Sequence, residues 1–126
     1  MATILIVEDD LSLLQLYKIM LEFEGFETYG AHNGEKAVNM FKSLTEKPNI
    51  ILMDHRMPIK NGIDAAKEIL AIDYSAKIIF VSAEPSVKNK ALSIGVIKFI
   101  KKPFSHDYLI SSIKTILNLS ECSNII

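Results

Sequence analysis

Residues 50–58 of this 126-residue chain read IILMDHRMP, in which four apolar residues precede an acid and a proline closes the stretch. A continuous apolar run of this kind predicts a strand that is covered on both faces, as in a parallel sheet. Pro58 has no N–H to donate to a neighbouring strand, so the strand must end before it. Ligands of open α/β sheets bind at the carboxyl ends of the strands, which makes Asp54 a candidate functional residue. Read alone, Asp54 could also be an acid that only begins a loop or caps a helix.

Four further segments have strand character, at residues 4–7, 26–31, 77–81 and 96–100. The segment at residues 4–7 is wholly apolar and ends in three acids, so we expect a second fully buried strand there. The segment at residues 26–31 is the weakest of the four and suits an edge strand.

Helical periodicity separates these strands. In the first such segment, Asp10 or Ser12 is the expected N-cap and Gly25 the expected stop. Its apolar residues recur at spacings of three and four, which predicts an inner face made of Leu13, Leu16, Tyr17, Met20 and Leu21. The later helices are expected to open at Gly34, at Gly62, at Pro85 with a thin apolar stripe as far as Gly95, and after a Ser105 cap with buried residues through Leu117.

Five strands that alternate with five helices predict a parallel sheet with helices on both faces, because βαβ crossovers are right-handed. The composition agrees with one globular domain, since 49% of the residues are hydrophobic and the net charge is −1. No basic surface for nucleic acid, no signal peptide and no apolar run long enough to cross a membrane is evident, so we expect a cytoplasmic protein. A single cysteine, Cys122, leaves no internal disulfide and no cysteine metal site.

Polar residues follow several of the predicted strands at their carboxyl ends. Glu8 and Asp9 follow the first strand and Asp54 ends the third, while Ser82 and Lys102 follow the fourth and fifth. If the first strand lies beside the third, their acids meet at one edge and repel one another unless a cation joins them. Oxygen ligands without histidine or cysteine suit Mg²⁺. A carboxylate nucleophile, a divalent cation, a lysine and a hydroxyl are the groups needed to receive a phosphoryl group.

With these motifs in this order, the chain resembles the receiver domain of two-component response regulators, of the single-domain CheY-like type. The resemblance covers residues 1–120 and leaves residues 121–126 as a polar tail. It implies a flavodoxin-like doubly wound sheet of five parallel strands in the order 2-1-3-4-5 with five helices. It also implies a switch without enzymatic turnover beyond its own phosphorylation and dephosphorylation, in which Asp54 accepts phosphate from a histidine kinase or a histidine phosphotransfer protein.

The same resemblance gives each site residue a role. Asp9, Asp54 and the backbone carbonyl of Arg56 would hold Mg²⁺, and Glu8, which stands where an Asp is commoner, would act through water. Lys102 and Ser82 would bind phosphoryl oxygens, and the bond before Pro103 is expected to be cis. Partners would be the phosphodonor and an unidentified output protein, without direct nucleic-acid or membrane binding, on a monomer or a phosphorylation-dependent dimer.

Two hypotheses concern neighbouring residues. Phe99 lies three residues before Lys102 and is the candidate switch aromatic, turning inward when Ser82 moves and changing the face of the fourth helix, fifth strand and fifth helix. Arg56 and Glu84 each lie two residues beyond a site residue, so an ion pair between them could slow the attack of water on a phosphorylated Asp54. Alternatively, each of these is an ordinary surface or core residue.

Three other functions compete with this interpretation. A hydrolase of the haloacid dehalogenase type needs a second acid two residues after the first, where this chain has Arg56. A flavin or nucleotide carrier needs a glycine-rich loop after the first strand, where this chain has acids. A degenerate receiver that binds partners without phosphorylation is the third. The sequence also leaves open whether the chain is complete or a receiver excised from a longer regulator.

Overall fold

The five strands form one parallel sheet with the order β2-β1-β3-β4-β5. The computed structural model describes the backbone of residues 2–125 and the side chains of residues 2–118. The strand bounds are β1 Thr3–Val7, β2 Glu27–Ala31, β3 Ile50–Asp54, β4 Ile78–Ser82 and β5 Lys98–Lys101. The predicted flavodoxin-like sheet and its strand order are confirmed, with β3 in the middle and β2 at an edge.

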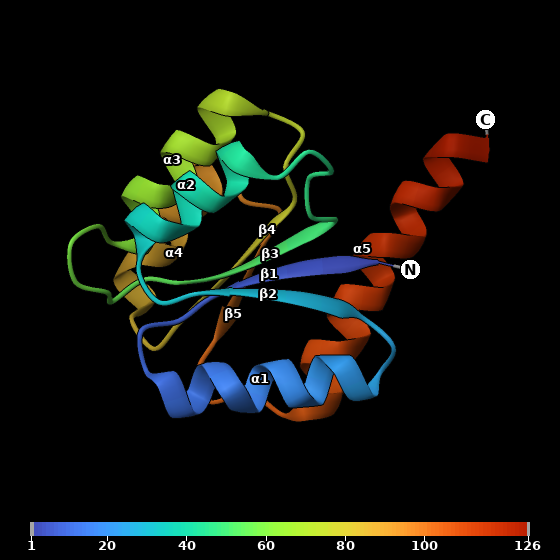
Figure 1. Ribbon diagram of the computed structural model, residues 1–126, viewed down its shortest axis with the longest axis horizontal. Helices are drawn as coiled ribbons and strands as arrows, with labels where there is room; N and C mark the ends of the chain where they lie inside the picture. Colours follow the sequence, from blue (N-terminus) through green and yellow to red (C-terminus); the bar gives the residue numbers. More distant parts are fainter. Residues whose placement is uncertain (1, 126) are drawn as a thin grey trace.

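Helices cover both faces of the sheet (Figure 1). Their bounds are α1 Leu11–Phe23, α2 Gly34–Ser43, α3 Gly62–Ile72, α4 Lys88–Ile94 after a 3₁₀ turn at Pro85–Val87, and α5 His106–Ile125. The α2, α3 and α4 helices pack on one face around Phe41 and Phe80, and α1 and α5 pack on the other around Leu21 and Ile113. The strands β1, β3 and β4 are therefore buried on both sides, as their apolar runs predicted.

The helix ends follow from local chemistry. The side chain of Asp10 caps α1 by accepting from the N–H groups of Ser12 and Leu13, so Asp10 rather than Ser12 is the cap. Gly95, with φ +111°, ends α4 in the left-handed conformation that glycine adopts without strain. Ser105 caps α5 by accepting from the N–H of Tyr108 through its hydroxyl.

Some expectations about these elements were wrong. Leu14, not Leu16, lies on the buried face of α1, and Leu16 is 57% exposed. The reason is that α1 is apolar on two faces, so spacing alone does not identify the inner one. The β5 strand begins at Lys98 rather than at residue 96. The α5 backbone is helical to Ile125. Ile126 and the side chains of the expected polar tail, residues 121–126, including Cys122, lie outside the described residues.

Candidate functional site

The site lies at the carboxyl edge of the sheet, where neighbouring strands end side by side. Asp54 is the last residue of β3, and its register partner in β4 is Val81, directly before Ser82. The β1 strand pairs with the other side of β3 as far as Val7 and Met53, so Glu8 emerges beside Asp54. Lys102 follows β5, and its backbone N–H donates to the Ser82 carbonyl at 3.0 Å. The predicted convergence of these residues is therefore present.

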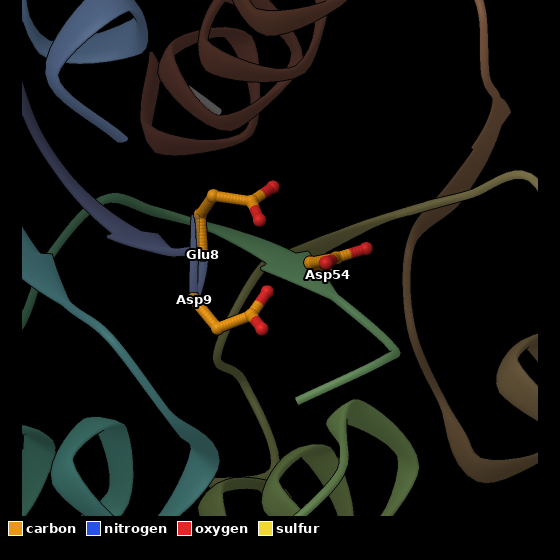
Figure 2. A group of neighbouring side chains, drawn as sticks. All are labelled: Glu8, Asp9 and Asp54. Carbon is orange, nitrogen blue, oxygen red and sulfur yellow. The ribbon is translucent and has the colours of Figure 1, made fainter. Parts of the chain in front are cut away.

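Three carboxylates form the acidic part of this edge. One oxygen from each of Glu8, Asp9 and Asp54 lies within 4.8 Å of the other two. Figure 2 shows Glu8 and Asp9 leaving the end of β1 in different directions, with both carboxylates turned toward the side where Asp54 stands. Glu8 is buried, Asp54 half-buried and Asp9 exposed, so the group opens to solvent on one side. A set of hard oxygen donors with one open side fits a small divalent cation that keeps some of its waters.

Lys102 is the cation of the site. Its Nζ lies 3.4 Å from Glu8 Oε1 and 3.4 Å from Asp54 Oδ1, so one ammonium group lies between two carboxylates. Burial alone would lower the pKa of Lys102, but the charges of Asp54 and Glu8 outweigh it and raise that pKa. Lys102 is therefore protonated at neutral pH. The peptide bond from Lys102 to Pro103 is cis, as expected.

Glu8 has the least solvent of the three acids, at 3% exposed. Burial, and then the negative charge of Asp54, raise its pKa above the ordinary value of 4.5. Its Oε2 accepts from the N–H of Asp10 at 3.2 Å, which favours the ionised form in part. The carboxylates thus repel one another across the site, and Lys102 relieves the repulsion only partly.

Ser82 is buried at the end of β4, and its Oγ accepts from the N–H of Glu84 at 3.0 Å. Glu84 forms an ion pair with the exposed guanidinium of Arg56 from the loop that follows β3. The hydrogen bond from Arg56 lowers the pKa of Glu84. The expected pairing of Arg56 with Glu84 is therefore present.

The loop between β3 and α3 carries Arg56 and is fixed by backbone contacts. The N–H of Gly62 donates to the His55 carbonyl at 2.9 Å, and a side chain at Gly62 would clash with the backbone of Asp54. The N–H of Gly34, at the start of α2, donates to the Lys60 carbonyl at 3.1 Å. Within this loop, Ile59 has φ +71°, which a β-branched residue rarely adopts. Its side chain is 75% exposed.

Three rings extend from this loop across the sheet. The His55 ring lies 5.8 Å from that of Phe80 in β4, and Phe80 stacks on Phe99 in β5 at 6.2 Å. Phe99 is thus already half-buried against the core. The Nδ1 atom of His55 is buried and has no hydrogen-bond partner among the described residues. No sequence pattern indicates this contact, because the path of the loop decides where the ring of His55 lies.

Comparison with known proteins identifies the family. Residues 4–114 match the family model of the response regulator receiver domain. This chain belongs to that family. Receiver domains are signalling switches of two-component systems rather than conventional enzymes, which rules out the dehalogenase and flavin-carrier alternatives.

Similar proteins include both single-domain and longer regulators. The chemotaxis protein CheY of Thermotoga maritima is 39% identical over 116 residues, which are 90% of this receiver domain and 95% of that protein. The transcriptional regulatory protein CpxR of Escherichia coli is 36% identical over 125 residues; the match includes 98% of this chain but only 52% of CpxR.

Solved structures agree on the fold. A CheY-like receiver domain protein from Methanospirillum hungatei superposes with a TM-score of 0.90 at 29% identity and covers 98% of both chains. The response regulator TrrA of Thermotoga maritima, solved in complex with Mg²⁺ and BeF, gives a TM-score of 0.84 at 31% identity and covers 92% of this chain and 99% of that one. No helix in the described part of the receiver domain is long and apolar enough to span a membrane.

Proposed function

We propose that this receiver domain is a phosphoacceptor switch in which Asp54 takes a phosphoryl group from a histidine kinase or a histidine phosphotransfer protein. The observation that carries the proposal is the meeting of three carboxylates within 4.8 Å with Lys102 placed between two of them. We place the protein in the cytoplasm and expect it to act through other proteins rather than through nucleic acid.

Magnesium is the cation that these residues fit best. Asp9, Asp54 and the carbonyl of Arg56 would hold it directly and Glu8 through water. When bound, Mg²⁺ neutralises the charge of the carboxylates and of the phosphoryl oxygens. Hard oxygen donors and the absence of histidine and cysteine from the group support this choice over zinc.

The transfer uses residues of this chain in distinct roles. An Asp54 oxygen attacks the phosphorus atom, and the bond from phosphorus to the donor histidine nitrogen breaks. The donor ring, protonated at its other nitrogen, leaves as a neutral imidazole. Lys102, which already contacts Asp54, binds one phosphoryl oxygen. The Ser82 hydroxyl turns from the Glu84 N–H to donate to another.

The phosphodonor has an apolar approach to this site. A groove between α1 and the segment after β5 is lined by Leu16, Ile19 and Phe23 and continues to Lys102 at the site. Phe23 is 85% exposed, so no other part of the described chain covers this side of the groove. A helix of the donor would pack on Leu16, Ile19 and Phe23 while it brings its histidine to Asp54.

The signal leaves through the face formed by α4, β5 and α5. When Ser82 moves toward the phosphoryl group, Phe99 shifts along Phe80 and changes this face for an output protein. The stacked contact between Phe80 and Phe99 supports this route. Replacement of Phe99 by Ala would make partner binding independent of phosphorylation, and binding that stays equally phosphorylation-dependent would contradict the switch.

Arg56 and Glu84 form a gate over the acyl phosphate. Their ion pair spans the loops that follow β3 and β4 and so lies across the two sides of the site. It hinders the approach of water to the phosphorus atom and lengthens the phosphorylated state.

Intact mass spectrometry after incubation with Mg²⁺ and acetyl phosphate tests the proposal. A phosphoryl adduct that is absent from Asp54→Asn and from protein in EDTA is the expected result. Failure of the wild-type chain to form any adduct would instead favour the degenerate receiver.

A further inference from the structure

Tyr17, on α1, lies at the end of the groove that is nearest to the acidic site. Its side chain is 7% exposed and belongs to the core between the sheet and the helices α1 and α5. It lines the groove together with Lys102 and Phe104. The rings of Tyr17 and Phe104 are stacked, with centroids 6.3 Å apart and planes at 17°. Since Phe104 follows Lys102 by two residues, this stack joins α1 to the segment that carries the lysine.

The hydroxyl of Tyr17 is close enough to the site to be affected by its charges. Burial raises the pKa of Tyr17 above the ordinary value of 10.0. Among the charges, that of Lys102 has the largest effect and lowers this pKa, while Glu8 and Asp54 raise it. Because the interaction of two charges weakens with distance, the hydroxyl lies on the lysine side of the site. Tyr17 is therefore a neutral phenol at neutral pH, next to the one ammonium group of the site.

Lys102 has a hydrogen-bond donor to spare. An ammonium group carries three N–H donors. Two of them have acceptors in Glu8 and Asp54, both at 3.4 Å, which is long for a hydrogen bond. The third N–H has no acceptor among the described residues, and the Tyr17 hydroxyl has no partner there either. A buried phenol usually has such a partner. An unused donor and an unused acceptor thus lie at the same end of the groove.

Few other groups on this side of the lysine could accept from it. Besides Lys102, the side chains with a nitrogen or oxygen that line the groove are Tyr17 and His106, and His106 is exposed. The Oγ of Ser82, behind the groove residue Ala83, already accepts from the N–H of Glu84. Tyr17 is the buried one of the two groove residues, and its ring is held by Phe104. It is therefore the best-placed acceptor for the third N–H.

We propose that Tyr17 is a positioning residue for phosphotransfer, whose hydroxyl accepts from the third N–H of Lys102 and directs the ammonium group toward the phosphoryl oxygens on Asp54. The inference rests on the proposed function of Asp54. Phosphoryl transfer depends chiefly on the placement of charge around the phosphorus atom, so a fixed ammonium group speeds it. A neutral phenol can fix the lysine without adding a fourth negative charge to the three carboxylates. A role in the core alone would need only the ring.

Matched removal of one hydroxyl group tests the proposal. Tyr17→Phe deletes the oxygen and keeps the ring that stacks on Phe104, and Tyr29→Phe, at an exposed tyrosine of β2, is the control. Formation of the Asp54 adduct from acetyl phosphate and Mg²⁺ is followed by intact mass spectrometry. We expect Tyr17→Phe to slow it about tenfold, the effect of losing one hydrogen bond to a charged group, and Tyr29→Phe to leave the rate unchanged. Urea denaturation verifies that both variants are folded.

Two further measurements separate positioning from a role in packing. The ¹⁵N signal of the Lys102 ammonium group, recorded without phosphodonor and with Mg²⁺ and beryllofluoride, should shift in Tyr17→Phe and not in Tyr29→Phe. In a Lys102→Met background, Tyr17→Phe should cause no additional slowing, because a residue that acts through the lysine has no effect once the lysine is gone.

The outcomes that overturn the inference are distinct from those that overturn the proposed function. Equal rates of adduct formation in the wild type and Tyr17→Phe, or an unchanged Lys102 signal, would show that the hydroxyl does not position the lysine. Slowing of the same size in the Lys102→Met background would mean that Tyr17 acts independently of Lys102. In each of these cases the wild type still forms its adduct and the proposed function stands, whereas a wild-type chain that forms no adduct contradicts the proposed function itself.

Discussion

The individual side chains of the acidic edge are arranged for a ligand at some expense to the stability of the free protein. Glu8, Asp9 and Asp54 share a small volume with one lysine, and burial of Glu8 adds to the repulsion. Such a group is more stable when a divalent cation is bound or when one charge is removed. The repulsion among these carboxylates should therefore affect the measured free energy of unfolding.

Asp9→Asn should therefore stabilise the protein in EDTA. The expected gain in the free energy of unfolding is about 1 kcal/mol, the size of the repulsion between two unit charges about 4 Å apart in water. The same substitution should reduce the further stabilisation that Mg²⁺ gives to the wild type. Urea denaturation with and without Mg²⁺ measures both effects, and Glu46→Gln, at an exposed acid away from the site, is the control. A destabilised Asp9→Asn protein in EDTA would show that the carboxylates do not repel one another significantly.

The ion pair between Arg56 and Glu84 predicts a kinetic effect. Arg56→Ala and Glu84→Ala should each shorten the lifetime of phosphorylated Asp54 only modestly, because an exposed ion pair is weak. The exchanged variant with Arg56→Glu and Glu84→Arg should recover part of the loss. Loss of the phosphoryl adduct is followed by mass spectrometry after acetyl phosphate is removed. Unchanged lifetimes in both single variants would rule out the gate.

The ionisation of Asp73 makes the free energy of unfolding depend on pH, independently of the acidic site. The hydroxyl and N–H of Ser75 donate to its carboxylate at 2.6 and 3.0 Å and lower its pKa below the ordinary value of 3.8. Because the folded-state pKa is the lower one, this contribution to stability is complete above about pH 4 and is lost as the pH falls through the folded-state value. Urea midpoints measured down to about pH 2 should fall less steeply in Asp73→Asn than in the wild type. Ser75→Ala should give an intermediate slope, because one of the two hydrogen bonds remains.

Among the helices, strands and loops, the β3–α3 loop bears the clearest strain. Ile59 adopts φ +71° with its side chain in solvent, so little packing compensates for the conformation. The backbone bonds of Gly34 and Gly62 to this loop hold it in place. The conformation of the loop that carries Arg56 is therefore held by hydrogen bonds to neighbouring segments and not by the backbone preference of its own residues.

Ile59→Gly should raise the free energy of unfolding by about 1 kcal/mol, because glycine adopts positive φ without steric cost. Ile72→Gly, at an exposed isoleucine in the last turn of α3, should lower it by about 0.5–1 kcal/mol. The opposite signs separate a backbone effect from the loss of an isoleucine side chain. Thermal or urea unfolding of the two variants provides the comparison. A loss of stability in both would mean that the Ile59 side chain makes contacts that outweigh the strain.

The strands and the acidic edge could be predicted because each depends on short-range patterns. An apolar run with an acid at its end predicts that Asp54 lies at the carboxyl end of a strand, whatever the position of that strand in the sheet. The inner face of α1 could not be predicted, because Leu14 and Leu16 fit a helical stripe equally well and only packing on the sheet separates them. The contact of His55 with Phe80 joins the loop after β3 to β4, a long-range contact that no local sequence pattern indicates.

Across the whole domain, the helices differ in how many residues they bury. The α3 helix buries five residues along its length, whereas α4 buries only Ala91 and is preceded by a 3₁₀ turn. The residues of β1, β3 and β4 are buried except for Thr3 and Asp54, which are partly buried. Local opening is therefore easiest on the side of the molecule that the proposed output partner contacts.

Hydrogen exchange should show this difference directly. Amides of α4 are expected to exchange faster than those of α3, and those of β3 slowest of all, in protein without ligand. Beryllofluoride with Mg²⁺ should slow exchange in α4 more than in α3, because the proposed switch acts on the former. Equal protection of the two helices in the free protein would contradict the uneven packing.

The parallel contact between Phe80 and Phe99 has a practical consequence for watching this protein at work. The chain contains no tryptophan, so a Phe99→Trp substitution would introduce a single indole, which can be excited selectively over the tyrosines. The emission maximum and the quenching of that indole would report the solvent exposure of β5 on the millisecond scale, while Asp54, next to the His55 end of the ring stack, gains or loses its phosphoryl group.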